Sequence, residues 1–390
     1  MSFIYLDAAA TANYSEKDDI VVDTIIDAMK RCWQNPSSLY ASNVKEVIDS
    51  SRKQIAEFIG AKSDEIYFTS GASESNNWAI KGWIEQASRS TWAPYRVITT
   101  PIEHKSILKI FEDPILNYYI RYCDIDENGL VRISSLRKWL RLCENNNVEE
   151  KAPVLVSIGM ANNEIGTLQN IKEIADVVHE FDGIIHVDAT QALPCIPIDV
   201  EELCIDMMSC SGHKISPVLK GIGFLYKKNC INIQPLICGA QENGLRGGTE
   251  NTLGIVGLAK AVELCDVGQE RFRELCSKRD YFVGALQHKF GCKLNGHYTY
   301  RLPNNINVTF PQNITGESLL YMLDMEDIKM STGSACNSKE ISPSHVLKAI
   351  GLTDEQAMRT VRFTLSDDIT YEDIDKVIEE IEKAIKLIET

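Results

Sequence analysis

The stretch DMMSCSGHKISPVLKGIGFLY, residues 206–226, decides the fold class, because it holds two strand candidates with a single lysine between them. The strand candidates are DMMSCS (206–211) and GIGFLY (221–226), and Lys214 lies in the connection. Small polar neighbours precede this amine: Ser211, Gly212 and His213. A lysine on a solvated surface has no need of such neighbours, so the segment indicates a site built between strands.

Strand and helix signals alternate on both sides of this stretch. One helix is predicted from Ser15 to Trp33, with Ser15 as N-cap, and a second from Val44 to Ile59, ending at Gly60. The first helix places Ile20, Val21, Ile25, Ile26 and Met29 on one face. Further strand candidates are EIYFTS (65–70), RVITT (96–100), PVLVSIGM (153–160) and IIHVD (184–188). This alternation predicts an α/β domain with a largely parallel sheet and helices on both faces.

Beyond about residue 263 the pattern changes. A long charged helix (268–290) is followed by strand candidates NINVTF (305–310) and TVRFTLS (360–366). A closing amphipathic helix carries Ile374, Val377, Ile378, Ile381, Ile385 and Ile388 at helical spacing. We therefore predict a large domain of residues 15–262, and a smaller α+β domain of residues 1–14 and 263–390 that the N-terminal strand FIYLD joins.

Composition narrows the class of protein. A net charge of −15 over 390 residues argues against a broad basic surface for nucleic acid. No apolar run approaches the roughly 20 residues that span a bilayer, and the first residues lack the pattern of a signal peptide, so a cytoplasmic protein is expected. The twelve cysteines form no C-x-x-C pair and do not cluster with histidine, which argues against a zinc site. In a reducing compartment most of them are expected to be buried.

Two further segments carry site chemistry. FTSGASESNNWAIKG (68–82) reads as a strand, a turn at Gly71 and a helix that begins near Ser73, an arrangement that favours a bound phosphate. It also fits a turn with no ligand, and it matches neither a P-loop nor a dinucleotide motif. IIHVDATQALP (184–194) places Asp188 at a strand end, where α/β sheets bind ligands, although such an Asp can equally cap the next turn.

These parts together match what pyridoxal phosphate requires. The lysine binds the aldehyde covalently, the acid keeps the pyridine nitrogen protonated so that the ring accepts electrons, and the helix start holds the phosphate. In this hypothesis Lys214 is the covalent anchor, and Ser211 and His213 are phosphate ligands beside it.

Seven motifs in order also resemble a known family. They are TSGASESNN, EHKS, NNEIGTLQ, HVDATQ, SGHK, RGGTEN and STGSACNS, and the likeness extends from YLDAAAT to VRFTLS. The pattern is similar to the cysteine desulfurases of the NifS and IscS type, within the fold-type I, class V aminotransferase-like enzymes. The resemblance implies a mainly parallel seven-stranded sheet in the large domain, a smaller α+β domain and a homodimer.

The resemblance also implies roles for individual residues. Lys214 binds the cofactor, Asp188 pairs with its ring nitrogen, and His104 stacks on the ring and helps to move protons. The remaining cofactor contacts that it implies are Ala72, Ser73, Asn163, Gln191, Ser211, His213 and, from the other subunit, Thr249. Substrate contacts are Asn35, Asn163 and Arg362, the arginine clamping the substrate carboxylate. Taken alone, Arg362 also fits a salt bridge and the Thr249 segment a surface turn.

Cys336 decides the chemistry. It lies in a segment rich in Ser, Gly, Thr and Asn, about 329–343, which predicts an exposed loop. The resemblance implies that a Cys336 thiolate attacks the sulfur of L-cysteine, giving L-alanine and a persulfide that passes to an acceptor protein. Iron–sulfur assembly, tRNA thiolation and DNA sulfur modification all use such enzymes, and the sequence does not choose among them.

The chain departs from the family pattern at three places. Gln34 and Tyr40 replace a glycine and a histidine in QNPSSLY, one extra residue follows His213-Lys214, and AAATA replaces A-A-T-T. These changes concern the mouth of the site and the partner surface. Selenocysteine lyase and class V aminotransferase remain alternatives, as does an inactive cofactor-bound scaffold for sulfur-transfer partners. A nicotinamide-dependent dehydrogenase lacks its glycine fingerprint here.

Overall fold

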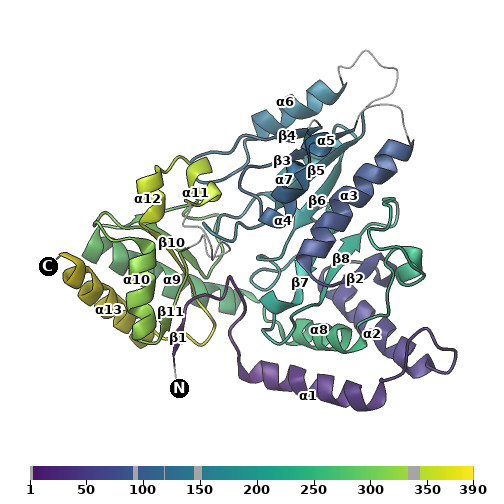
Figure 1. The fold of residues 1–390 in the computed structure, drawn as a ribbon, viewed down its shortest axis with the longest axis horizontal. Helices are drawn as coiled ribbons and strands as arrows, with labels where there is room; N and C mark the ends of the chain where they lie inside the picture. The colour runs from purple at the N-terminus through teal and green to yellow at the C-terminus, as the bar shows by residue number, and fades with distance from the viewer. Residues whose placement is uncertain (1–2, 91–94, 118, 145–151, 333–342, 390) are drawn as a thin grey trace.

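The computed structural model describes residues 3–90, 95–117, 119–144, 152–332 and 343–389, and Figure 1 shows how their elements are arranged. One group of elements surrounds a large sheet on the right of the view, and a second group lies on the left. The N-terminal strand and the C-terminal helix both belong to the group on the left.

The large sheet has seven strands within the described residues, in the order β2-β8-β7-β6-β5-β3-β4. Its strands are β2 (Ile66–Thr69), β3 (Arg96–Thr99), β4 (Ile120–Tyr122), β5 (Val154–Gly159), β6 (Ile184–Asp188), β7 (Met207–Ser211) and β8 (Gly223–Lys227). Strand β8 pairs antiparallel with β2 and β7, and the other pairs are parallel. The predicted fold class is therefore confirmed. The three-residue edge strand β4 was not among the predicted strands.

Helices cover both faces of this sheet (Figure 1). They are α1 (Glu16–Arg31), α2 (Ser42–Phe58), α3 (Ala72–Ser90), α4 (Lys105–Leu108), α5 (Pro114–Asn117), α6 (Ile133–Glu144), α7 (Ile171–His179) and α8 (Thr252–Leu264). Short 3-10 turns are η1 (Ser63–Glu65), η2 (Lys109–Glu112), η3 (Gly212–Lys214) and η4 (Glu242–Gly244).

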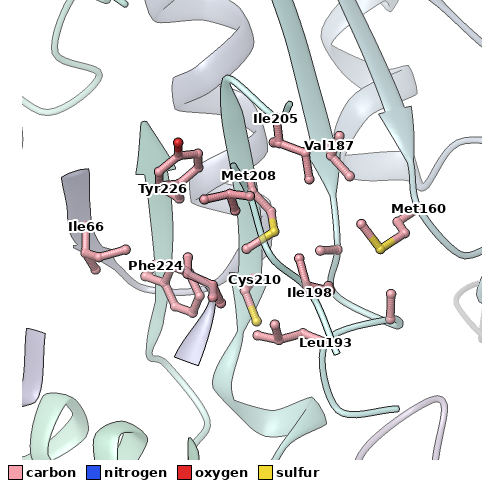
Figure 2. Close-up of a cluster of buried hydrophobic side chains, with 14 of the residues drawn as sticks. Ile66, Met160, Val187, Leu193, Ile198, Ile205, Met208, Cys210, Phe224 and Tyr226 are labelled. Atoms are coloured by element: carbon pink, nitrogen blue, oxygen red, sulfur yellow. The ribbon is translucent and has the colours of Figure 1, made fainter. Parts of the chain in front are cut away.

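Alternation along β7 and β8 divides the core between the two faces. Met208 and Cys210 of β7 and Phe224 and Tyr226 of β8 are fully buried on one face (Figure 2), which α1, α2 and α8 cover. The intervening residues face α3, where Met207 and Leu225 belong to a cluster with Trp78. Because successive strand residues point to opposite faces, apolar residues at every position produce a sheet that is buried on both sides.

The first predicted helix is α1, and part of its predicted face is wrong. Ser15 is the N-cap, and its backbone N–H donates to the Asp18 carboxylate at 2.7 Å. The buried side holds Val21 and Ala28, together with Asp18, which accepts a hydrogen bond from Ser216. The side that faces the core follows the helical spacing 18, 21, 25 and 28, and three residues of the predicted face lie outside this stripe and are exposed: Ile20, Ile26 and Met29.

The second group of elements encloses its own hydrophobic core. Its strands are β1 (Ile4–Tyr5), β9 (Lys293–Leu294), β10 (Asn305–Thr309), β11 (Ile328–Lys329) and β12 (Thr360–Thr364). Its helices are α9 (Gln269–Phe290), α10 (Gly316–Met325), α11 (His345–Ala349), α12 (Asp354–Met358) and α13 (Tyr371–Glu389). Strand β1 pairs with β11, and β10 lies between β12 and β9. The predicted N-terminal strand thus lies beside the C-terminal elements, while the domain limits at 15 and 262 stay a prediction.

The strand register aligns the carboxyl ends of three central strands of the large sheet. Gly159 of β5 pairs with Asp188 of β6, and Asp188 pairs with Ser209 of β7. The carboxyl ends of these parallel strands therefore lie side by side, which is where open α/β sheets bind ligands. No helix among the described residues is long and apolar enough to cross a membrane.

Candidate active site

A pocket of about 650 Å³ opens at the carboxyl ends of β5, β6 and β7. The start of α3 lines one wall, and Arg362 of β12 lines another. Residues Ala9, Ala10 and Thr11 of the N-terminal segment also line it. Its volume lies within the range of about 300–1,000 Å³ that small-molecule sites occupy.

The start of α3 forms a polar cradle within this pocket. Ser70, Gly71, Ala72 and Ser73 line the wall where the 19-residue helix begins. Gly71 has φ of 143°, and a Cβ there would lie 3.3 Å from Ser211 Oγ. The first N–H groups of a helix carry partial positive charge and have no partners within the helix. The sequence prediction of a strand, a turn at Gly71 and a helix is confirmed, with the helix beginning at Ala72.

The turn after β7 faces this cradle. Ser211 Oγ lies 2.8 Å from His213 Nδ1, and both residues line the pocket. Burial, together with the charges of Lys214 and Lys220, lowers the pKa of His213 to about 4. The His213 ring is therefore neutral near pH 7 and offers the pocket hydrogen bonds without a net charge.

Lys214 reaches from this turn toward the N-terminal segment. Its Nζ donates to the carbonyl oxygens of Ala9 at 2.6 Å and Ala10 at 2.7 Å. Gln191 Nε2 donates to the same Ala9 carbonyl at 2.9 Å. The amine and the amide thus converge at one side of the pocket.

Asp188 lies buried at the carboxyl end of β6. Its Oδ2 accepts from Asn76 Nδ2 of α3 at 2.7 Å, and its Oδ1 accepts from the Thr190 N–H at 3.0 Å. Two donors to a buried carboxylate compensate for the loss of water and fix its direction.

His104 is the N-cap of α4 and faces the pocket opposite the turn at Ser211. Its Nδ1 accepts from the Ser106 N–H at 3.1 Å and lies 2.8 Å from Ser106 Oγ. Burial lowers the pKa of His104, while the Asp188 carboxylate acts in the opposite direction.

Arg362 is held at the pocket by an acid and a carbonyl. Its Nη2 donates to Asp7 Oδ1 at 2.6 Å, and its Nη1 donates to the Asn163 carbonyl at 2.9 Å. The Arg362 side chain is 5% exposed, and its Nε has no partner among the described residues. The guanidinium is thus oriented at the pocket wall with donor capacity left over.

Three of the predicted site residues are not placed in this pocket. Thr249 is exposed and does not line it. Asn35 is also exposed and away from the lining, and its Oδ1 accepts from the Ser37 N–H at 2.9 Å. Cys336 lies outside the described residues. The pocket does bring together Ala72, Ser73, His104, Asn163, Asp188, Gln191, Ser211, His213, Lys214 and Arg362.

Known proteins resemble this chain in sequence over nearly its whole length. The family described as Aminotransferase class-V matches residues 4–377. The chain belongs to this family. Within it, the chain is 40% identical to the cysteine desulfurase IscS of Dictyoglomus turgidum, covering 99% of this chain and 95% of the relative.

Solved structures of similar chains agree with this membership in the class-V family. A NifS-like protein superposes with a TM-score of 0.86 at 31% identity, covering 99% of this chain and all of that one (100%). SspA, solved in complex with cysteine, superposes with a TM-score of 0.77 at 32% identity, covering 93% of this chain and 99% of that one.

Enzymes of the class-V family and cysteine desulfurases use pyridoxal phosphate, and the residues present here fit that group. Thr190 Oγ1 is buried at the pocket and has no partner among the described residues. An unsatisfied buried hydroxyl at a ligand site indicates that the ligand supplies its hydrogen bond. The α3 cradle suits a phosphate, and Lys214 and Asp188 suit an aldehyde and a ring nitrogen.

Sequence reasoning missed several residues of this site. Asp7, Asn76 and Ser106 make direct contacts to predicted site residues. Each lies in a motif that was recognised, YLDAAAT, TSGASESNN or EHKS, so the signal was present. What the motifs could not give was the direction of each side chain.

Proposed function

We propose that the chain is a pyridoxal phosphate-dependent cysteine desulfurase. It removes sulfur from L-cysteine, releases L-alanine and leaves a persulfide on Cys336. One observation carries the proposal: Lys214, Asp188, His104 and Arg362 surround a single pocket in a chain that is 40% identical to a cysteine desulfurase.

The cofactor site in this proposal uses the contacts already described. The N-terminus of α3 with Ser73, and the pair Ser211 and His213, hold the phosphate. Asp188 pairs with the ring nitrogen, and the Lys214 amine binds the aldehyde. When bound, pyridoxal phosphate supplies an aldehyde for the amino group of the substrate and a ring that accepts electrons from the α-carbon.

Arg362 orients the substrate. Its guanidinium is fixed by Asp7 and the Asn163 carbonyl, and its remaining donors can bind the α-carboxylate as a charge-assisted pair. A fixed carboxylate limits the orientations that the substrate can take in the pocket that Lys214 also lines. Holding reactants in this way reduces the entropic cost of the reaction.

Cys336 is the proposed nucleophile, and the described chain that precedes it pairs with β12 at Ser331. The Ser331 N–H and carbonyl pair with the backbone of Arg362 at 3.2 and 2.7 Å. Cys336 follows Ser331 by five residues (336 − 331), a distance that extended chain covers within about 18 Å. In the reaction the C–S bond of cysteine breaks and an S–S bond forms. The Cys336 thiol loses one proton, and the β-carbon of the substrate gains one when it becomes the methyl group of alanine.

A homodimer and an acceptor protein belong to this proposal. Thr249 and Asn35 are predicted site residues that lie outside the pocket of their own chain, as a site completed by a second copy requires. Large apolar side chains near Asn35 are exposed, with Trp33 at 75% and Leu39 at 97%. Ten cysteines of the described part of the chain are free thiols, which suits the cytoplasm.

The proposal is tested by replacing Cys336 with Ala. The purified protein with pyridoxal phosphate is expected to convert L-cysteine to L-alanine, and Cys336→Ala is expected to lose at least about 100-fold of this activity, because the nucleophile is gone. Cys230→Ala is the matched control, since Cys230 is also an exposed cysteine but does not line the pocket. The visible absorbance of bound cofactor should persist in both variants. Full activity in Cys336→Ala would refute the nucleophile, and no alanine from the unaltered protein would refute the function.

A further inference from the structure

A chain of hydrogen bonds joins Asp188, which is predicted to pair with the ring nitrogen, to His104, which is predicted to stack on the ring. Asp188 Oδ2 accepts from Asn76 Nδ2 at 2.7 Å, and the same Nδ2 donates to Ser106 Oγ at 2.9 Å. Ser106 Oγ lies 2.8 Å from His104 Nδ1. Four side chains from β6, α3 and α4 are therefore linked in one line.

The Ser106 backbone determines the state of the His104 ring. Its N–H donates to Nδ1 at 3.1 Å, and a backbone N–H cannot accept a hydrogen bond. Nδ1 must present its lone pair to that N–H, so the proton of the neutral ring lies on Nε2. Protonation of Nδ1 would set two donors against each other.

The Asn76 amide has one possible orientation in this line. Asn76 is fully buried, and its Oδ1 has no partner among the described residues. Rotating the amide would bring Oδ1 against the Asp188 carboxylate, where two acceptors repel. The side chain therefore gives both amide hydrogens to Asp188 and Ser106 and leaves an acceptor unsatisfied. A buried acceptor without a partner lowers the stability of the fold. The orientation is therefore explained by the hydrogen bonds to Asp188 and Ser106 and not by a gain in stability.

We propose that Ser106 and Asn76 are positioning residues that hold His104 as the neutral tautomer with its proton on Nε2. His104 then presents an N–H donor at Nε2 to the pocket. This inference rests on the proposed function for its catalytic meaning, whereas the tautomer itself is a property of the protein alone.

The charges around His104 are compatible with a neutral ring. Burial lowers its pKa most, and one nearby carboxylate, Asp188, acts against this. The cations that lower it further are Lys214, His345 and Lys105.

The tautomer can be read directly by nuclear magnetic resonance. The full-length protein is labelled with ¹⁵N in the rings of its seven histidines, and His104 is assigned by the signals that vanish in His104→Gln. Without added cofactor, Nδ1 is expected to show the shift of an unprotonated nitrogen and Nε2 that of a protonated one. A proton on Nδ1, or on both nitrogens at pH 7, would overturn the proposal, whether or not the enzyme is active.

Two substitutions test the role of Ser106. Ser106→Ala removes the hydroxyl donor and is expected to raise the pKa of His104 by roughly half a unit or more, because the neutral ring loses one bond. We expect kcat to fall roughly tenfold with KM unchanged, because the Nε2 donor is no longer held in one direction. Ser106→Thr keeps the hydroxyl and should restore both values.

Ser88→Ala is the matched control. Ser88 lies on α3, and its hydroxyl bonds only to the Ile84 carbonyl at 2.8 Å within the helix. It should leave the His104 shifts and kcat as they are. If Ser106→Ala also leaves them unchanged, Ser106 has no positioning role. If Ser106→Ala fails to fold, the tautomer in the unaltered protein and the Thr variant still decide.

Discussion

Glu103 occupies a place where a carboxylate ionises with difficulty. It precedes His104 and is 5% exposed, with Oε1 accepting from Thr100 Oγ1 at 2.6 Å and Oε2 from the Gly159 N–H at 2.8 Å. Burial and, to a lesser extent, the charge of Asp188 raise its pKa against the opposing effect of the two hydrogen bonds, and the result is a pKa of about 7. Glu103 is thus the buried acid of the pocket wall that changes charge near neutral pH.

This shift predicts a pH-dependent stability. The folded-state pKa of about 7 lies above the ordinary 4.5, so folding favours the protonated form of Glu103. The stabilisation is complete below about pH 4.5 and is lost as the pH rises through 7, a change of about 3 kcal/mol in the free energy of unfolding. In Glu103→Gln, whose amide can still bond Thr100 and Gly159, this loss should be absent.

The measurement is urea unfolding between pH 5 and 8.5. The difference in unfolding free energy between Glu103→Gln and the unaltered protein should grow in favour of the variant as the pH rises. Glu46→Gln, on the exposed side of α2, is the control and should follow the unaltered protein. Parallel curves for Glu103→Gln and the unaltered protein would contradict the prediction.

At the scale of elements, β8 allows the start of α3 to lie close to the turn that carries Lys214. Strand β8 lies between β2, which leads into Gly71 and α3, and β7, which leads into Lys214. A Cβ on Gly223, the first residue of β8, would lie 2.4 Å from the Cys210 carbonyl and 2.6 Å from Gly71 Cα. Only a residue without a side chain lets the two turns lie this close.

Gly223→Ala should therefore weaken cofactor binding. Backbone atoms cannot move aside as a flexible side chain can, so β2 and β7 must separate, and the α3 cradle shifts relative to Lys214. We expect the affinity for pyridoxal phosphate to fall roughly tenfold or more, with a stability loss of about 1–3 kcal/mol from overpacking. Titration of the visible absorbance with cofactor measures the affinity.

Gly284→Ala is the comparison variant, and its effect on stability should have the opposite sign. Gly284 lies in α9, and a Cβ there meets nothing within 4 Å. Alanine should raise stability by about 0.5–1 kcal/mol, because glycine loses more backbone entropy in a helix. If Gly223→Ala binds cofactor as tightly as Gly284→Ala, the close approach does not shape the site.

Elements were the level at which sequence reasoning worked best. The predicted strands matched β2, β3, β5, β6, β7 and β8 because each is an apolar run bounded by turn residues. Strand β4 was missed since IRY (120–122) is too short to show a period. The face of α1 was partly wrong because apolar residues also lie beside its buried stripe, and periodicity alone does not tell which of them the core covers.

At the scale of the whole molecule, the local sequence predicted where motifs lie but not which distant residues contact them. Lys214, Asp188 and Ser73 could be placed at strand and helix ends because local spacing determines those positions. Their partners could not: the Asn76 amide reaches Asp188 from 112 residues away, and Asp7 reaches Arg362 from 355. Such pairs join segments that are far apart in the chain, so no short window of sequence contains them.

The Asp7–Arg362 pair connects the first and last strands to the substrate site. Asp7 forms a bridge with Thr364, which puts the carboxylate beside β12, and Asp7 Oδ1 accepts from Arg362 Nη2 at 2.6 Å. Asp7 raises the pKa of Tyr5 as well, although burial is the larger cause of its rise to about 12. If Arg362 binds the substrate as proposed, recognition depends on how the N-terminal segment is joined to β12.

Asp7→Asn should accordingly act on substrate binding. The amide keeps an oxygen for Arg362 but removes the charge, so the guanidinium is held less firmly while its own charge remains available to the substrate. We expect KM for L-cysteine to rise roughly tenfold with kcat changed less than about threefold, the pattern of a lost binding interaction. Steady-state alanine formation measures both constants.

Asp327→Asn is the control, because that exposed carboxylate lies 3.7 Å from Lys329 and away from the pocket. An unchanged KM in Asp7→Asn would mean that Arg362 is held by the Asn163 carbonyl alone or does not bind the substrate.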